Sequence, residues 1–186
     1  TDKKFHTLQH QISVVFICLL LLSIFTITLI NGLFLEKYYV SKKVEVLEEA
    51  KEVLSQMNLD DILQYDTDIE EDKKGATDEI SDEIERSSSR NNLTWIIVNE
   101  ENSGYYYWGE NNMAKMLRSK LFGYINNLDQ DMQHSRVLKK TDTCTMWQVH
   151  DRFAGMEYVE CWGQFDNGYY FLIRSPLESI KESASI

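Results

Sequence analysis

The sequence has none of the motifs that identify the common hydrolases and nucleotide-binding enzymes. It contains no nucleophile elbow, no phosphate-binding loop and no zinc-protease motif. It also has no low-complexity segment and no internal repeat at solenoid spacing. We therefore expect no catalytic centre, no metal and no cofactor in these 186 residues. An active site assembled from distant residues is the alternative, because catalytic triads are defined by geometry rather than by spacing.

Charge is absent from residues 12–35, an apolar run that reads ISVVFICLLLLSIFTITLINGLFL. As a helix, a run of this length exceeds the roughly 30 Å hydrocarbon core of a bilayer. Its few polar residues are scattered and form no stripe, which argues against a buried helix of a soluble domain. The run is also longer than the apolar core of a signal peptide. It therefore predicts an uncleaved transmembrane helix in a cell membrane.

The orientation of this helix follows from the short segment before it, residues 1–11, which contains Lys3 and Lys4. Positively charged flanks stay on the cytoplasmic side. Residues 1–11 are therefore expected to be a cytoplasmic tail, and residues 36–174 an extracytoplasmic domain. A length of about 140 residues suits one domain with a single core.

Basic residues are few: 19 Lys and Arg stand against 30 Asp and Glu, a net charge of −11. Such a chain repels nucleic acid, whereas cations and basic peptides are attracted to it. Carboxylates are densest between residues 60 and 85. Asp66, Asp68 and Glu70 alternate as at the start of a calcium loop, but the later glycine and bidentate glutamate are absent. We expect a solvated acidic surface there, with specific cation binding as the alternative.

Cysteine is also scarce, with three residues in all. Cys18 lies in the apolar run, which leaves Cys144 and Cys161 in a compartment where disulfides persist. A turn centred on Phe153 would bring these two nearly opposite each other on neighbouring strands. We therefore predict a disulfide, with free thiols as the alternative. A zinc site that adds His150 is weakly indicated, because the sequence has no closely spaced ligand pair.

The remaining chain alternates between helix and strand patterns. Residues 36–57 contain no Gly or Pro and have apolar positions three and four apart, so the membrane helix is expected to continue through them. Further helices are predicted at 76–90, with Ile80 and Ile84 inward, and at 111–125. Strands are predicted at 93–99, 105–108, 136–150, 156–165 and 169–174. This order predicts an α+β domain with a five-stranded antiparallel sheet flanked by helices.

The last residues, 175–186, contain the signals of a new helix. Ser175 is suited to be the N-cap, Pro176 to the first helical position, and Glu178 to completing a capping box. We expect this helix to lead towards a second membrane span.

The overall layout and the closing phrase YYFLIRSPLESIKESASI resemble the N-terminal sensory region of bacterial two-pass sensor histidine kinases. The resemblance implies a PAS-like outer domain, a homodimer and a two-component signal transduction system. It also implies that the kinase lies beyond residue 186, since no phosphoacceptor histidine region and no ATP-binding motif occurs in these residues. The alternatives are a single-pass anchored binding module without kinase output, or the sensor of a chemoreceptor or cyclase.

A sensor needs a concave surface with aromatic walls and a few polar groups. Arg152 could meet an anionic ligand there, as could Arg174. The ligand class stays open between a small molecule, a cation and a peptide, and ordinary core packing is the alternative for each aromatic residue. The predicted ligand-contacting residues are Trp95, Tyr107, Trp147, Trp162, Tyr170 and Arg152.

Overall fold

The computed structural model describes residues 2–57, 79–99, 105–109 and 113–177. The chain divides into two compact units, residues 1–39 and residues 40–186. The predicted acidic calcium-like segment 66–70 and the capping residue Glu178 lie outside the described residues.

Helix α1 (Asp2–Ser55) contains the apolar run and continues without a break into the second unit. The predicted unbroken continuation of the apolar helix through residues 36–55 is therefore confirmed. Within the part of the chain that the structure describes, this is the one helix long and apolar enough to cross a membrane, judged by length and composition. Large apolar side chains of residues 12–35 are exposed, as a lipid-facing helix requires.

The second unit is an α+β domain whose six strands form one antiparallel sheet in the order β2-β1-β6-β5-β4-β3. The described residues of this unit also form the end of α1, helices α3 (Glu79–Asn91) and α4 (Ala114–Ile125), and the 3-10 helix η1 (Gln130–His134). The strands are β1 (Thr94–Val98), β2 (Tyr105–Trp108), β3 (Arg136–Lys140), β4 (Cys144–Asp151), β5 (Met156–Gln164) and β6 (Tyr170–Pro176). The predicted class is confirmed, but the predicted count of five strands is wrong.

The extra strand arises because residues 136–150, expected to be one strand, fold back on themselves. Thr141 makes the turn: its N–H donates to the Cys144 carbonyl at 2.9 Å, and its hydroxyl accepts from the Cys144 N–H at 3.1 Å. No Gly or Pro marks this turn in the sequence, so the hydroxyl of a threonine replaces the usual signals. The turn separates β3 from β4.

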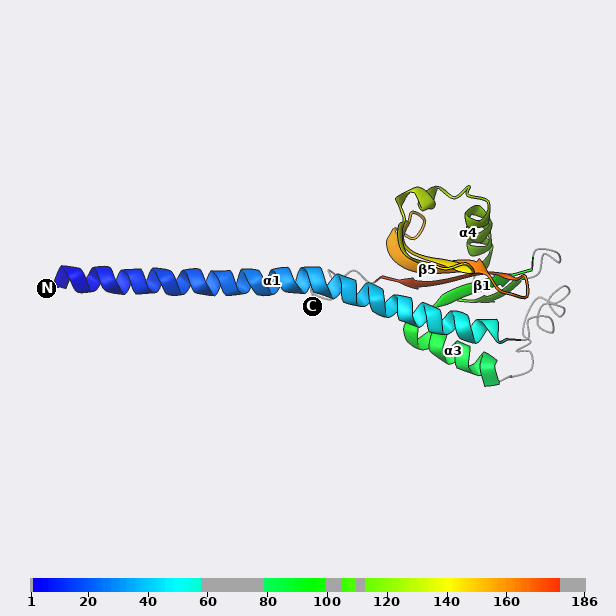
Figure 1. The fold of residues 1–186 in the computed structure, drawn as a ribbon, viewed down its shortest axis with the longest axis horizontal. Coiled ribbons are helices and arrows are strands. Elements are labelled where there is room, and N and C mark those ends of the chain that lie inside the picture. The colour runs from blue at the N-terminus through cyan, green and yellow to red at the C-terminus, as the bar shows by residue number, and fades with distance from the viewer. Residues whose placement is uncertain (1, 58–78, 100–104, 110–112, 178–186) are drawn as a thin grey trace. The chain divides into compact units, whose positions relative to one another are not determined.

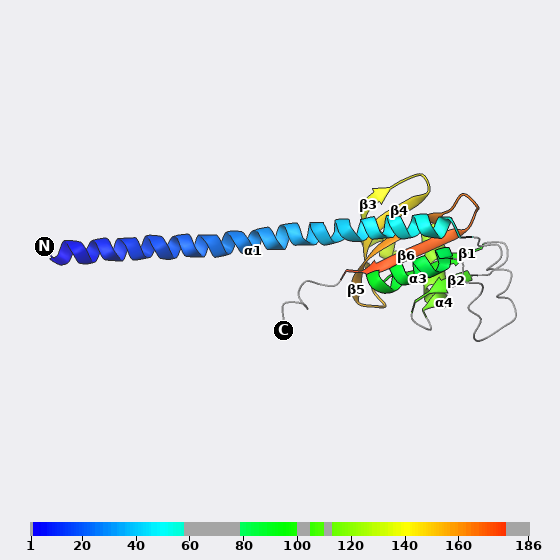
Figure 2. The ribbon, with the colours of Figure 1, turned by 90° about the horizontal axis from the view of Figure 1, so that it is seen from below.

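Each face of the sheet carries its own apolar cluster, because alternate side chains of a strand point to opposite faces. On one face, Leu47 and Leu54 of α1 and Ile84 of α3 pack against the strands. On the other face, Leu117 and Leu121 of α4 do so. Figure 1 shows α3 and the cyan end of α1 on one side of the sheet and α4 on the other, and Figure 2 shows α1 and α3 side by side across the strands.

The end of β6 differs from the prediction that Ser175 and Pro176 begin a helix. Both residues belong to β6, where Ser175 pairs with Val159 of β5 and Pro176 with Tyr158. Ser175 is fully buried, and its hydroxyl donates to the Asn91 carbonyl at the end of α3. This hydroxyl also lies 2.7 Å from the Lys43 ammonium of α1. Pairing and burial of Ser175 therefore override its preference for a helix N-cap.

Candidate functional site

Five ionisable side chains are buried together beneath α4. Each comes from a different element: α4, η1, the end of β4, β5 and β6. Such a cluster is unusual, because charged side chains are seldom fully buried unless they are paired. We refer to it as the charge network, and its members are Lys120, Asp131, Asp151, Glu160 and Arg174.

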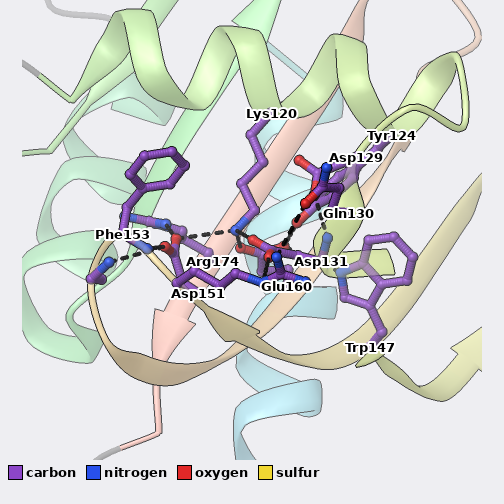
Figure 3. Close-up of polar contacts among 12 residues, drawn as sticks. Lys120, Tyr124, Asp129, Gln130, Asp131, Trp147, Asp151, Phe153, Glu160 and Arg174 are labelled. Carbon is purple, nitrogen blue, oxygen red and sulfur yellow. Dashed lines mark hydrogen bonds and ion pairs between the residues drawn. The ribbon is translucent and has the colours of Figure 1, made fainter. Parts of the chain in front are cut away.

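Helix α4 positions Lys120 because that residue falls on the apolar face of the helix. It follows Leu117 by three residues and precedes Tyr124 by four, and both of these neighbours are fully buried. Its ammonium lies within ion-pair distance of three carboxylates, as Figure 3 shows. The distances from Nζ are 3.3 Å to Asp131, 3.1 Å to Asp151 and 3.4 Å to Glu160.

Asp151 joins the network to the β4–β5 turn. Its Oδ1 accepts hydrogen bonds from the N–H groups of Phe153 at 2.9 Å and Ala154 at 3.0 Å. Its Oδ2 accepts from Lys120 and, at 2.8 Å, from the guanidinium of Arg174. One carboxylate therefore fixes the turn, α4 and β6 to one another, and a shift in any of them must change its bonds.

Glu160 links the charges to an aromatic cluster. Its Oε2 accepts hydrogen bonds from the Tyr124 hydroxyl at 2.6 Å and the Trp147 indole at 3.2 Å. Burial and the nearby Glu160 raise the pKa of Tyr124, so its hydroxyl stays protonated and donates. Tyr124, Trp147 and Trp162 are in mutual ring contact, with centroids 4.6–5.6 Å apart.

Arg174 is enclosed by protein, with 1% of its surface exposed. Its guanidinium pairs with Asp151 and lies over the ring of Tyr158, 4.2 Å from the centroid. Among the described residues, neither its Nε nor the indole Nε1 of Trp162 has a hydrogen-bond partner. Buried polar groups without a partner are rare in folded proteins, so these two atoms are unusual features of the site.

The two buried cations of the network are both engaged by carboxylates, so neither is left unpaired to hold an anionic ligand. Three buried carboxylates face two buried cations. Arg152, whose side chain is half exposed, balances the excess by pairing with Asp131 at 3.3 Å and donating to Gln130. Arg152 and Arg174, both considered for an anionic ligand, are thus each engaged by a carboxylate.

Four of the predicted ligand-contacting aromatic residues lie on the α4 face: Tyr107, Trp147, Trp162 and Tyr170. Trp95 is separated from them, because it is buried on the opposite face of the sheet and donates its indole N–H to Ser88 of α3 at 2.9 Å. The sheet therefore divides the predicted set in two.

Sequence reasoning missed Lys120, Asp131, Asp151 and Glu160 as site residues; Asp151 was considered only as the start of a turn. A signal existed for Lys120, which stands at helical spacing among apolar residues. Glu160 stands inside a strand run between Val159 and Cys161, where a lone acidic residue is unexpected. No pattern identified Asp131, because it lies in a short 3-10 turn between two polar stretches.

Cys144 and Cys161 are free thiols in the structure. Their strands pair as expected, but Cys144 is opposite Gly163, and Cys161 is opposite Met146. The offset is therefore two residues rather than one, which leaves both side chains on the same face of the sheet. His150 is exposed and pairs with Glu157. Among the residues that the structure describes, no group of three His, Cys, Asp or Glu side chains could hold a metal ion.

The charge network sets the pKa of two of its members in opposite directions. Burial opposes ionisation of Asp151, but the Ala154 N–H and the two buried cations hold its pKa below the ordinary 3.8. Burial also opposes the charged form of Lys120, but attraction by Glu160 and Asp151 outweighs it and raises its pKa above the ordinary 10.5. Both groups are therefore charged at neutral pH.

These pKa shifts predict a pH range over which the contribution of Asp151 and Lys120 to the unfolding free energy is constant. A lowered carboxyl pKa stabilises the fold above about pH 4, and this contribution is lost as pH falls through the folded-state value. A raised lysine pKa stabilises the fold below about pH 10, and this contribution is lost as pH rises through the folded-state value. In urea titrations, the difference in unfolding free energy between wild type and Asp151→Asn should be constant between about pH 5 and 9 and shrink at lower pH. A steep change inside that range would contradict the pairing.

Comparisons with protein-family models, with curated proteins and with solved structures each give no match.

Proposed function

We propose that residues 36–174 form the extracytoplasmic ligand-sensing domain, PAS-like in its topology, of a membrane sensor histidine kinase in a two-component system. In this proposal α1 is the anchor with its N-terminus in the cytoplasm. The domain acts as a homodimer, and a conformational change passes through α1 and through the chain that follows β6. The catalytic part of the protein then lies beyond residue 186.

The observation that carries the proposal is the position of Arg174. It lies near the end of β6, two residues before Pro176, and its ion pair with Asp151 connects β6 to the turn and to α4. The opposite face of the same sheet packs against α1 through Leu47, and Lys43 of α1 contacts Ser175 of β6. The two outputs in this proposal, α1 and the end of β6, therefore meet at one sheet whose other face carries the charge network.

A ligand can switch such a domain only if it binds two arrangements with different free energy. A cationic or polar ligand that competes for Asp131 or Glu160 would weaken the bonds of Lys120 to those carboxylates. Because Lys120 and Arg174 share Asp151, the bond of Arg174 would then change as well. The charge network therefore supplies the differential contacts that sensing requires.

The proposal is tested on the full-length product of the gene. Sequence after residue 186 should contain a second apolar span of about 20 residues, a phosphoacceptor histidine helix and an ATP-binding domain. Reconstituted in lipid vesicles, the protein should transfer the γ-phosphate of ATP to its own histidine. A reading frame that lacks these segments would make the chain an anchored binding module and reject the proposal.

The role of the charge network is tested by Arg152→Gln, which alters its half-exposed edge without leaving a new unpaired cation in the core. Autophosphorylation should change several-fold in either direction. Glu157→Gln is the matched control, because Glu157 lies on the neighbouring strand and pairs only with exposed His150 at 3.3 Å among the interactions described. Equal activity of Arg152→Gln, Glu157→Gln and wild type would remove the network from the signalling path.

A further inference from the structure

Cys144 and Cys161 lie together on the face of the sheet that packs against α1. Both belong to the apolar cluster that includes Leu47, Ala50 and Leu54 of that helix. They lie on adjacent paired strands with their side chains on the same face, and each thiol is the largest influence on the pKa of the other. The two sulfurs are therefore neighbours although the residues are not directly opposite.

The surroundings of the two thiols differ in a way that suits a nucleophile and a resolving group. The Cys144 sulfur is 3.2 Å from the Thr141 hydroxyl. The Cys161 hydrogen bond outweighs the effect of burial and, with help from Thr141 and Lys51, lowers the pKa of Cys144 to about 5. The hydrogen bond to Cys144 and burial raise the pKa of Cys161 well above its usual range. Cys144, which also has the Thr141 hydroxyl and Lys51 nearby, is thus the more acidic thiol of the pair.

Access to solvent follows the same asymmetry. Cys144 opens β4, directly after the exposed turn residues Asp142 and Thr143, and 6% of its surface is exposed. Cys161 lies in the middle of β5 and has no exposed surface. A small reagent from solution can therefore meet Cys144 first, whereas Cys161 can react only with Cys144.

We propose that Cys144 and Cys161 form a reversible redox site that takes low-molecular-weight disulfides as its reactant. The Cys144 thiolate attacks one sulfur of the external disulfide, whose S–S bond breaks and releases one thiolate. That thiolate takes a proton from solvent. The Cys161 sulfur then attacks the Cys144 sulfur, and the second thiolate leaves with the proton of Cys161. The protein loses two thiols to one disulfide, and the external disulfide is reduced to two thiols.

The reaction changes the electrostatic surroundings of α1, because oxidation removes the negative charge of the Cys144 thiolate beside that helix. Lys51 of α1 interacts with the Cys144 sulfur and donates to the Thr143 hydroxyl at 3.1 Å. Glu48, one turn earlier on α1, is close enough to influence Cys161. A disulfide is neutral, so its formation leaves Lys51 without its anionic partner and favours a change in how α1 packs on the sheet. This step does not depend on the proposed kinase, since the chemistry and the helix contact both lie within residues 40–186.

The test uses the whole chain in detergent, with Cys18→Ser to remove the thiol of the apolar run. After incubation with oxidised glutathione, the intact mass should fall by about 2 Da, and reduction with dithiothreitol should restore it. Cys161→Ser should stop at a glutathione adduct on Cys144. Cys144→Ser should form no adduct while folded, since Cys161 is shielded. Circular dichroism of both variants establishes that they retain the fold.

Three outcomes would overturn the proposal. Wild type could react only after unfolding, the Cys161→Ser adduct could fail to form, or the disulfide could form but resist dithiothreitol in the folded state.

The link to α1 has its own measurement: hydrogen exchange of residues 44–54 should differ at least twofold between the oxidised and reduced forms. Thr141→Val should slow alkylation of Cys144 several-fold, because it removes the hydroxyl that stabilises the thiolate. Unchanged exchange or unchanged alkylation would contradict these roles.

Discussion

Replacement of Lys120 by methionine should lower the unfolding free energy of the domain by about 3–5 kcal/mol at neutral pH. Methionine fills a similar volume on the apolar face of α4, so little packing is lost. The loss is electrostatic, because three buried carboxylates would each lose a cation that lies within 3.4 Å. Breaking a buried ion pair by removing one partner costs far more than breaking an exposed pair.

Two comparisons distinguish this electrostatic loss from a loss of packing. Lys115→Met changes the same residue type on the same helix, but Lys115 is exposed, so we expect a change within about 0.5 kcal/mol. The Lys120→Met deficit should also shrink as pH falls from 7 to about 5, because carboxylates deprived of their cation bind protons more readily in the folded state. Urea unfolding at a series of pH values checks both. A deficit that does not vary with pH would assign the effect of Lys120 to packing.

The elements of the fold were largely predictable because local patterns carried the information. The apolar run, the unbroken continuation of α1 and the pairing of β1 with β2 each follow from spacing or composition within one segment. The boundary between β3 and β4 did not, since a threonine hydroxyl makes that turn. A side-chain hydrogen bond of this kind depends on the pairing of the strands, which a single segment does not specify.

The charge network was the least predictable feature, since its residues come from five elements that meet only in the folded domain. The sequence shows Glu160 only as an acidic residue within a strand. It can be buried because Tyr124 and Trp147 donate hydrogen bonds to its carboxylate. The aromatic residues were easier to predict as candidate ligand contacts. Trp95 and Trp147 were nevertheless predicted to contact the same ligand, although they lie on opposite faces of the sheet. Their faces depend on the register of each strand, and one residue of shift reverses it.

The cysteine pair was predicted from the sequence less fully than the helices and strands, but more fully than the charge network. Neighbouring antiparallel strands were predicted, and the offset between Cys144 and Cys161 was misjudged by one residue because the turn is centred after Phe153 rather than on it. The sequence therefore located the pair but gave no reason to expect its acid–base asymmetry. That asymmetry comes first from the contact between the two thiols and then from Thr141 of the β3–β4 turn and Lys51 of α1, none of which the spacing of the two cysteines reveals.

Asp151→Ala should have an effect as large as Lys120→Met, about 3–5 kcal/mol, but for a different combination of reasons. It removes the partner of two buried cations and the acceptor of two turn N–H groups at once. Asp151→Asn separates these contributions, because its amide oxygen can still accept from Phe153 and Ala154 while the charge is lost. We expect Asp151→Asn to recover about 1 kcal/mol relative to alanine, the usual net value of a hydrogen bond.

A double-mutant cycle then shows whether Asp151 joins the elements or only stabilises each of them. If the 2.8 Å contact with Arg174 holds the turn to β6, the effects of Asp151→Ala and Arg174→Met must be non-additive, with a coupling of about 1–3 kcal/mol. The matched cycle on exposed His150 and Glu157 should give less than about 1 kcal/mol. Additive effects at Asp151 and Arg174 would mean that the turn and β6 move independently, and the path from the charge network to the end of the domain would be lost.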